Sequence, residues 1–305
     1  MRSRIMLPVL VSAAIAVIAA ARGPGLVYEG DSPYNHLIVE EDAKGVRKLL
    51  FEKNGAVQSA IKPGEPLALE LPYTRAAMLA LALVPSPKKV LNIGLGGGAM
   101  PMFLRKLHPE TVIEVVELDP GVVKVAKGYF GFKEDSRMKV HVADGRGWTE
   151  AASGGWDLVF LDAYGKGEIP RHLATLEFLR CVRAKLAKGG LVDGIVWEPV
   201  SIPLDAEMVR TYREAFIDLC VTMVPSSGNR IFFAGRVMPV VDQWVASAAE
   251  LSARSKLPFE LSMYARAGCL REDDVEAPLL RDLPTPQVPA PHVPEGQVPA
   301  EPPPP

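Results

Sequence analysis

The chain has 305 residues, with 34 basic and 36 acidic side chains, a net charge of -2 and 48% hydrophobic residues. This composition is typical of a globular protein with at most two domains. It excludes nucleic acid as the main partner, because binding to a phosphate backbone requires a surplus of basic residues. The three cysteines form no C-x-x-C pair and the five histidines show no metal-binding spacing, so the sequence predicts no metal site. Cys181 and Cys220 lie in apolar segments and are predicted to pack as small buried hydrophobic side chains.

Residues 1–21 have the order of a secretory signal. Arg2 and Arg4 precede a nearly uncharged run that closes with three alanines at residue 21. This run is shorter than the roughly 20 strongly apolar residues that a spanning helix needs. We therefore expect an exported protein, with the segment either cleaved near Ala21 or kept as a membrane tether. The alternative is a cytoplasmic protein in which this segment is not a signal.

Residues 27–72 are predicted to form a small antiparallel β module. Short strand-like runs of polar followed by apolar residues stand at 36–39 and at 47–51, and Asn54 and Gly55 form the dipeptide of a tight turn. Next, the stretch from Tyr73 to Val84 has helical composition and is predicted to be one helix that ends before the prolines that follow.

From residue 89 onward, short apolar strands alternate with helices of about a dozen residues, a spacing typical of α/β proteins. The predicted strands are 89–93, 112–117, 139–142, 157–161, 191–197, 221–224 and 231–234, and the predicted helices are 99–107, 121–129, 173–186 and 206–217. The pattern predicts a Rossmann-like, doubly wound and mostly parallel sheet over residues 73–235, with helices on both faces and an antiparallel strand pair at one edge.

Two segments follow this predicted sheet. Residues 236–282 are predicted to form a helical extension. Residues 283–305 contain ten of the 28 prolines of the chain and are predicted to be a disordered tail, because such a segment cannot bury enough surface to offset its ordering entropy.

Glycine and acidic residues follow four successive predicted strands. In chain order they are Gly94, Gly96 and Gly98, then Glu117 and Asp119, then Asp144 and Gly145, and finally Asp162. Glycines between a strand and a helix let the backbone approach a ligand, and an acid about twenty residues later can accept hydrogen bonds from ribose hydroxyls. Because the carboxyl ends of parallel strands share one edge of the sheet, we expect a nucleoside site there, with Asp144 placed to meet an adenine amino group.

The chain resembles the class I S-adenosylmethionine-dependent methyltransferase fold and, within it, the spermidine synthase (polyamine aminopropyltransferase) family. The segments that carry the resemblance are SPYNH at 32–36, Tyr73, GLGGG at 94–98, VVELDPGVVKVAKGYF at 115–130, HVADGRGW at 141–148, WDLVFLDAYG at 156–165 and LAKGGL at 186–191. The resemblance implies aminopropyl transfer from decarboxylated S-adenosylmethionine to an amine such as putrescine, and a homodimer built around the N-terminal strand module.

Site roles also follow from the resemblance. It implies that Asp162 is the catalytic aspartate and also binds the amine, that Glu117 binds the ribose and that Asp144 contacts the adenine. Asn35, Tyr73 and Tyr164 are expected to line the amine site.

Two positions depart from the family pattern. Ala99 stands where family members carry an aspartate that matches the amino end of the decarboxylated donor, and Gly165 stands where a second aspartate is usual. A diamine site should contain several carboxylates, because a buried ammonium without a partner is costly. Two further hypotheses are therefore methyl transfer from intact S-adenosylmethionine, and an exported nucleoside-binding scaffold without catalytic activity.

Overall fold

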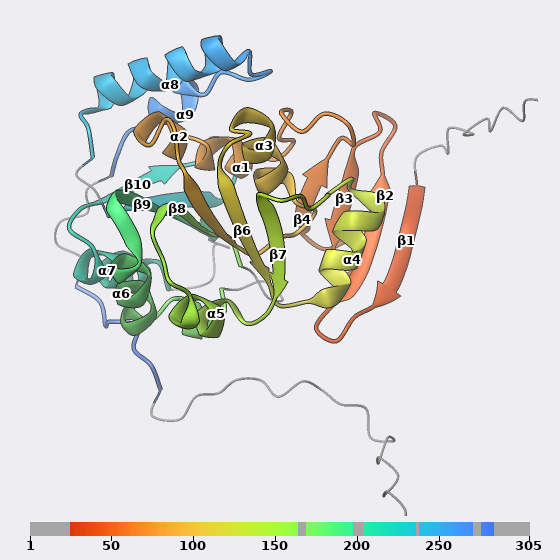
Figure 1. Ribbon diagram of the computed structural model, residues 1–305, viewed down its shortest axis with the longest axis horizontal. Helices are drawn as coiled ribbons and strands as arrows, with labels where there is room; N and C mark the ends of the chain where they lie inside the picture. The colour runs from red at the N-terminus through yellow and green to blue at the C-terminus, as the bar shows by residue number, and fades with distance from the viewer. Residues whose placement is uncertain (1–24, 164–168, 198–203, 236–237, 271–275, 284–305) are drawn as a thin grey trace, which may run out of the picture.

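The computed structural model describes residues 25–163, 169–197, 204–235, 238–270 and 276–283. The predicted signal segment and the proline-rich tail from residue 284 lie outside these residues. A seven-stranded sheet runs through the molecule between two layers of helices, and a four-stranded sheet stands at its side (Figure 1).

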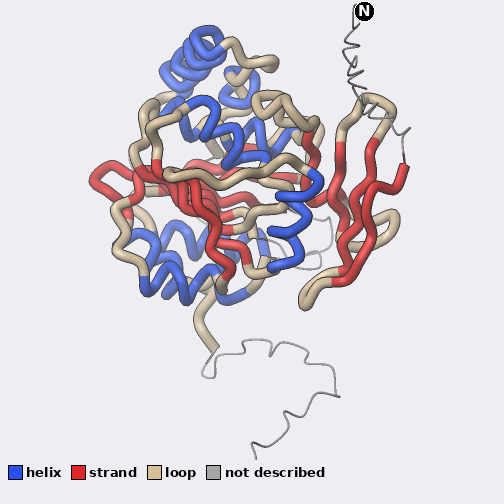
Figure 2. The backbone as a smooth tube through the Cα atoms, turned by 45° about the vertical axis from the view of Figure 1, so that its right-hand side comes forward, coloured by secondary structure: helices blue, strands red, loops and turns tan. Residues whose placement is uncertain are grey.

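The four-stranded sheet is the predicted antiparallel module. Its strands are β1 (Gly25–Asp31), β2 (His36–Glu41), β3 (Arg47–Leu50) and β4 (Val57–Ile61), each paired with the next. Leu37, Val39, Leu49 and Ile61 are buried and belong to the same hydrophobic core as one face of the large sheet. The module is therefore packed against the rest of the chain, beside α4 (Pro120–Tyr129), as the turned view shows (Figure 2).

The seven-stranded sheet has the order β10-β11-β9-β8-β5-β6-β7. Its strands are β5 (Lys89–Ile93), β6 (Val112–Glu117), β7 (Met138–Val142), β8 (Trp156–Leu161), β9 (Leu186–Trp197), β10 (Leu219–Met223) and β11 (Asn229–Ala234). Strands β5 to β9 are parallel to their neighbours, whereas β11 pairs antiparallel with both β9 and β10. The predicted mostly parallel sheet with an antiparallel pair at one edge is thus confirmed.

Helices cover both faces of this sheet, as predicted. One face packs against α1 (Pro72–Ala77), α2 (Ala80–Leu83), α3 (Ala99–Leu107), α4, α8 (Val241–Ser255) and α9 (Ser262–Ala265), and the other against α5 (Gly145–Ala151), η1 (Arg171–Leu173), α6 (Leu176–Ala184) and α7 (Leu204–Ala215). Alternation along each strand supplies both layers, since Val90 faces the first and Leu91 the second. In the described ranges, no helix has the length and apolar character needed to cross a membrane.

The single helix predicted from Tyr73 to Val84 is instead two short helices, α1 and α2. At the break, the Met78 and Leu79 N–H groups donate to carbonyls three residues earlier, at 3.1 and 2.9 Å. The Leu79 carbonyl accepts from the Trp244 indole of α8 at 3.4 Å. Met78 and Leu79 are both fully buried. The local helical preference is therefore overridden by packing beneath α8, a segment more than 150 residues away in sequence.

The prediction for Cys220 is wrong in one respect, because the residue is buried but bonded. Cys220 on β10 forms a disulfide with Cys269, which is 49 residues later. The pairing arises because Leu270 forms an isolated antiparallel bridge with Val221, which brings the end of the helical extension beside the edge strand. Cys181 is a free, half-buried thiol.

Candidate active site

Gly94 ties together the ends of three neighbouring strands. Its N–H donates to the Val116 carbonyl of β6 at 2.8 Å, and the Asp162 N–H donates to the Ile93 carbonyl of β5 at 2.9 Å. Gly94 has a φ of 98°, and a Cβ there would lie 2.1 Å from the Asp162 carbonyl oxygen. Only glycine fits both requirements, so this residue lets Asp162 lie directly beside the glycine loop.

The rest of the loop also depends on glycine. Gly96 and Gly98 have φ values of 53° and 88°, and Gly98 is the residue from which α3 begins. A Cβ on Gly98 would lie 2.7 Å from the Phe132 ring. The glycines that the sequence singled out therefore shape the turn between β5 and α3.

The Glu117 carboxylate holds this loop against the end of β6. It accepts hydrogen bonds from the Leu95 N–H at 2.8 Å and from the Asp119 N–H at 2.9 Å. Burial raises the pKa of Glu117 above its usual range, although the two N–H donors act in the opposite direction. Glu117 is half-buried, so part of its carboxyl group remains available to a ligand that lies on the loop.

Asp162, directly after β8, lies next to Tyr73 of α1. The Tyr73 hydroxyl hydrogen-bonds with the Asp162 carboxyl and lies 3.3 Å from the Gln58 carbonyl oxygen of the N-terminal module. Burial raises the pKa of Asp162 to about 8, the Tyr73 hydrogen bond opposes this rise, and the charge of Glu117 adds to it. Such a carboxyl can accept a proton near neutral pH. Tyr164, the other tyrosine expected here, lies outside the described residues.

Asp119 and Asn35 contact each other, whereas the sequence suggested that each faces a ligand. One Asp119 oxygen caps α4 by accepting from the Gly121 N–H at 2.8 Å. The other accepts from the Asn35 amide at 2.9 Å and from the Ser32 hydroxyl at 2.5 Å. Asp119 is only 1% exposed. In the structure these residues anchor the N-terminal module to the large sheet.

Asp144 begins α5 after β7. One of its oxygens accepts from the Gly147 N–H at 2.8 Å, and the other lies 2.8 Å from the His172 imidazole. The hydrogen bond with His172 holds the pKa of Asp144 below its usual range. Gly145 packs against β5, where a Cβ would lie 2.6 Å from Ile93. The sequence did not single out His172, because this residue comes close to Asp144 only when the chain folds into the turn of η1.

A small apolar hollow lies at the carboxyl ends of β5 and β8. It is lined by Ile93, Leu161, Ala163, Ile169, Leu173, Ile195, Met208 and Tyr212. Its apolar lining suits the face of a flat heterocycle.

Asp193 on β9 is a further acid near this edge that sequence reasoning missed. It is 1% exposed, and burial, followed by the charge of Asp162, raises its pKa well above the usual range. An acid inside the otherwise apolar strand LVDGIV could have indicated it. We looked only for acids at strand ends and therefore missed it.

Comparisons with known proteins show the family of this chain. The family model described as the spermine/spermidine synthase domain matches residues 72–233. The chain is 31% identical to the polyamine aminopropyltransferase of Vibrio vulnificus over 267 residues, which cover 84% of this chain and 88% of that protein.

Solved structures show the same fold. A probable spermidine synthase from Corynebacterium glutamicum aligns with a TM-score of 0.66 and 21% identity, over 82% of this chain and 97% of that one. Human methyltransferase-like protein 13, in complex with SAH, aligns with a TM-score of 0.57 and 24% identity, over 62% of this chain and 94% of that one.

Proposed function

The chain belongs to the spermine and spermidine synthase family, and we propose that it transfers an aminopropyl group from decarboxylated S-adenosylmethionine to an amine such as putrescine. The observation that carries this proposal is Asp162. Its carboxyl group lies beside the glycine loop, next to Tyr73, with its pKa raised to about 8. A group of this kind can bind an ammonium and then take its proton.

In the proposed reaction, the amine nitrogen attacks the methylene carbon of the aminopropyl chain that is bonded to the sulfonium. A carbon–nitrogen bond forms, the carbon–sulfur bond breaks, and its electron pair goes to sulfur, which leaves methylthioadenosine. The proton lost by the nitrogen passes to Asp162 and then to solvent. The protein contributes alignment of the two reactants and a base at the nucleophile.

The donor would be bound by three elements that meet at the sheet edge. Glu117, already held against the loop, would accept from the ribose hydroxyls, and Asp144 would accept from the adenine amino group. The apolar hollow beside them would take the purine face. Asp119 is only 1% exposed whereas Glu117 is half-buried, so we assign the ribose to Glu117 alone. The homodimer that the resemblance implies stays a prediction.

The assay that tests this proposal uses the purified protein with decarboxylated S-adenosylmethionine and putrescine. Chromatography should show equal amounts of methylthioadenosine and spermidine. If no methylthioadenosine forms with any of several amines, the proposal is wrong, and the hypothesis of a non-catalytic scaffold gains support.

Methyl transfer is a second candidate function, because α3 begins with Ala99 and places no acid there to select the decarboxylated donor. We expect calorimetry above pH 8 to show tighter binding of the decarboxylated donor, since ionised Asp162 repels the carboxylate of the intact one. Glu117→Gln should weaken both donors alike, by about tenfold to a hundredfold, because it removes a charge-assisted acceptor that the two share. Preference for the intact donor would instead favour methyl transfer.

We also propose that the protein is exported, with residues 1–21 cleaved or kept as a tether. The disulfide between Cys220 and Cys269 supports this, because disulfides persist in oxidising compartments. Fractionation should find the protein outside the cytoplasm, with only Cys181 alkylated before reduction.

Cys220→Ser should cost roughly 2–4 kcal/mol of stability in melting experiments. Cys181→Ser, the matched control, should cost little. If reductant did not change the wild-type melting curve, the disulfide would not contribute to stability, and the support that it gives to export would be lost.

A further inference from the structure

Asp193 is a buried acid without a hydrogen-bond partner among the described residues. It lies in the middle of β9 with 1% of its surface exposed, and both of its carboxyl oxygens are buried and unpaired. Its neighbours in register are Phe160 on β8 and Phe233 on β11, both fully buried. Phenylalanine offers no donor, so the sheet surrounds this carboxyl group with apolar side chains.

Asp193 and Asp162 lie on the same face of adjacent strands. Phe160 is level with Asp193, and Asp162 stands two residues beyond Phe160, nearer the carboxyl edge. Two residues of a strand rise by about 6.6 Å and neighbouring strands lie about 4.8 Å apart, so the two α-carbons are roughly 8 Å apart. The charge of Asp162 contributes to the raised pKa of Asp193, in agreement with this closeness.

A second unsatisfied acceptor lies at the same level of the sheet. Asn92 on β5 is in register with Phe160, it is 1% exposed, and its side-chain oxygen has no donor among the described residues. Its amide nitrogen donates to the Gly94 carbonyl. Two strands that flank β8 thus present buried acceptors that lack donors among the described residues, and a bound donor group is one explanation for such acceptors.

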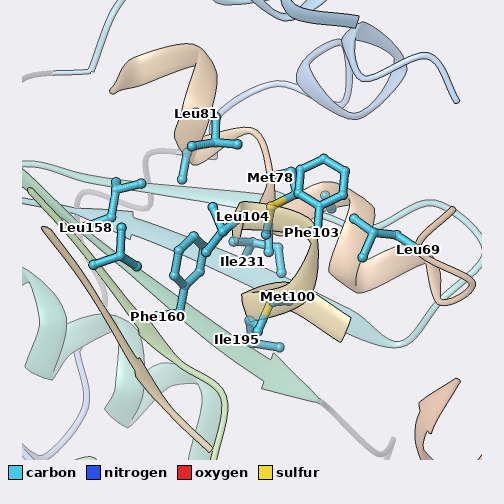
Figure 3. Packing of buried hydrophobic residues seen from close by; sticks show 14 of the residues in the cluster. Leu69, Met78, Leu81, Met100, Phe103, Leu104, Leu158, Phe160, Ile195 and Ile231 are labelled. Atoms are coloured by element: carbon cyan, nitrogen blue, oxygen red, sulfur yellow. The ribbon is translucent and has the colours of Figure 1, made fainter. Parts of the chain in front are cut away.

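The walls around Asp193 are apolar. Phe160, Ile195 and Met100 gather in the layer between the sheet and α3 (Figure 3). Ile195 is two residues beyond Asp193 on the same strand face, and the register therefore places it level with Asp162. Two buried carboxyl groups among apolar side chains match a ligand that has methylene groups in the middle and a positive charge at each end.

We propose that Asp193 binds the distal ammonium of a short diamine whose other nitrogen lies at Asp162. The inference rests on the proposed function and adds to it the residue that distinguishes a diamine from a monoamine. Asp193 acts as a binding residue that sets acceptor specificity, and the ammonium supplies the donor that its carboxyl group lacks. The Asn92 oxygen lies beside this end of the site.

The test compares 1,4-diaminobutane with 1-aminobutane as acceptors. The wild-type KM for the diamine should be at least about tenfold below that for the monoamine, since one charge-assisted contact is lost with the latter. Asp193→Asn should raise the diamine KM at least about tenfold, leave the monoamine KM unchanged and leave donor affinity unchanged. Asp242→Asn, an exposed carboxylate on α8, is the control with the same charge change and should alter none of these values.

Equal KM values for the two amines in the wild type would overturn the inference, and so would an unchanged diamine KM in a folded Asp193→Asn variant. Turnover by the wild type in either case would leave the proposed function intact. If no amine gives methylthioadenosine, the proposed function fails by itself. Calorimetry of 1,4-diaminobutane with wild type and variant then decides the site: at least about tenfold weaker binding to the variant supports it, and equal binding refutes it.

Discussion

Asp162→Asn is expected to lower kcat for methylthioadenosine formation by about 10²- to 10⁴-fold, the usual contribution of a positioned base. The amide has nearly the shape of the carboxyl group but cannot accept the proton of the attacking amine. The raised pKa sets the pH dependence: below pH 8 the carboxyl group is mostly protonated and cannot act as a base. Wild-type kcat/KM should therefore rise as pH increases through about 8, as a pH–rate profile of the free enzyme would show.

Two controls separate this role from a structural one. Tyr73→Phe removes the hydrogen bond that lowers the pKa of Asp162, so the inflection of the profile should move to higher pH while activity remains. Because the folded-state pKa lies above the unfolded value, ionisation of Asp162 makes the wild type less stable as pH rises from about 4 to 8. Asp162→Asn should thus melt no lower than the wild type at pH 8. Near-normal turnover in Asp162→Asn would rule out Asp162 as the base.

Gly94→Ala is expected to destabilise the protein by at least about 3 kcal/mol and to abolish donor binding. The new Cβ would lie 2.1 Å from the Asp162 carbonyl oxygen, in a backbone conformation with a φ of 98° that alanine rarely adopts. Relief of this clash has to separate the ends of β5 and β8, which moves Asp162 away from the loop. Chemical denaturation and donor calorimetry measure the two effects.

Gly128→Ala is the matched control for this substitution. Gly128 is an exposed residue within α4, has no positive φ, and a Cβ there meets nothing within 4 Å. This change should therefore stabilise the protein by about 0.5–1 kcal/mol, because alanine is the better helix former. A Gly94→Ala variant as stable as Gly128→Ala would show that the loop does not require glycine.

The order of strands and helices was open to prediction because its signals are local. The apolar runs of β5 and β6 and the helix α3 have the predicted bounds, since each is bordered by glycine, proline or charged residues. Because the carboxyl ends of parallel strands share one edge of the sheet, the sequence placed Gly94, Glu117 and Asp162 together. The structure brings these three into contact through the loop backbone.

Two local features were not visible in the sequence. The helix α5 is short and begins with glycine, so its periodicity is weak, and its start depends on the Asp144 cap. The break between α1 and α2 occurs in a stretch of good helix formers. Only the packing of this stretch beneath α8, where the Trp244 indole donates to the Leu79 carbonyl, explains it.

The sequence by itself determined the fold class and the edge of the sheet where chemistry is concentrated, because hydrophobic period and glycine position act over a few residues. Tertiary structure decided which partner each acid takes. Asp119 is held by Asn35, Asp144 meets His172, and Asp193 has no donor within the described part of the chain. Such contacts can join residues that lie more than 80 positions apart in the sequence, as Asp119 and Asn35 do, so no local pattern encodes them. Asp119, Asp144 and Asp162, which looked equivalent in the sequence, therefore differ in the structure: Asp119 anchors the N-terminal module, Asp144 caps α5, and Asp162 is the buried carboxyl group that we propose as the base.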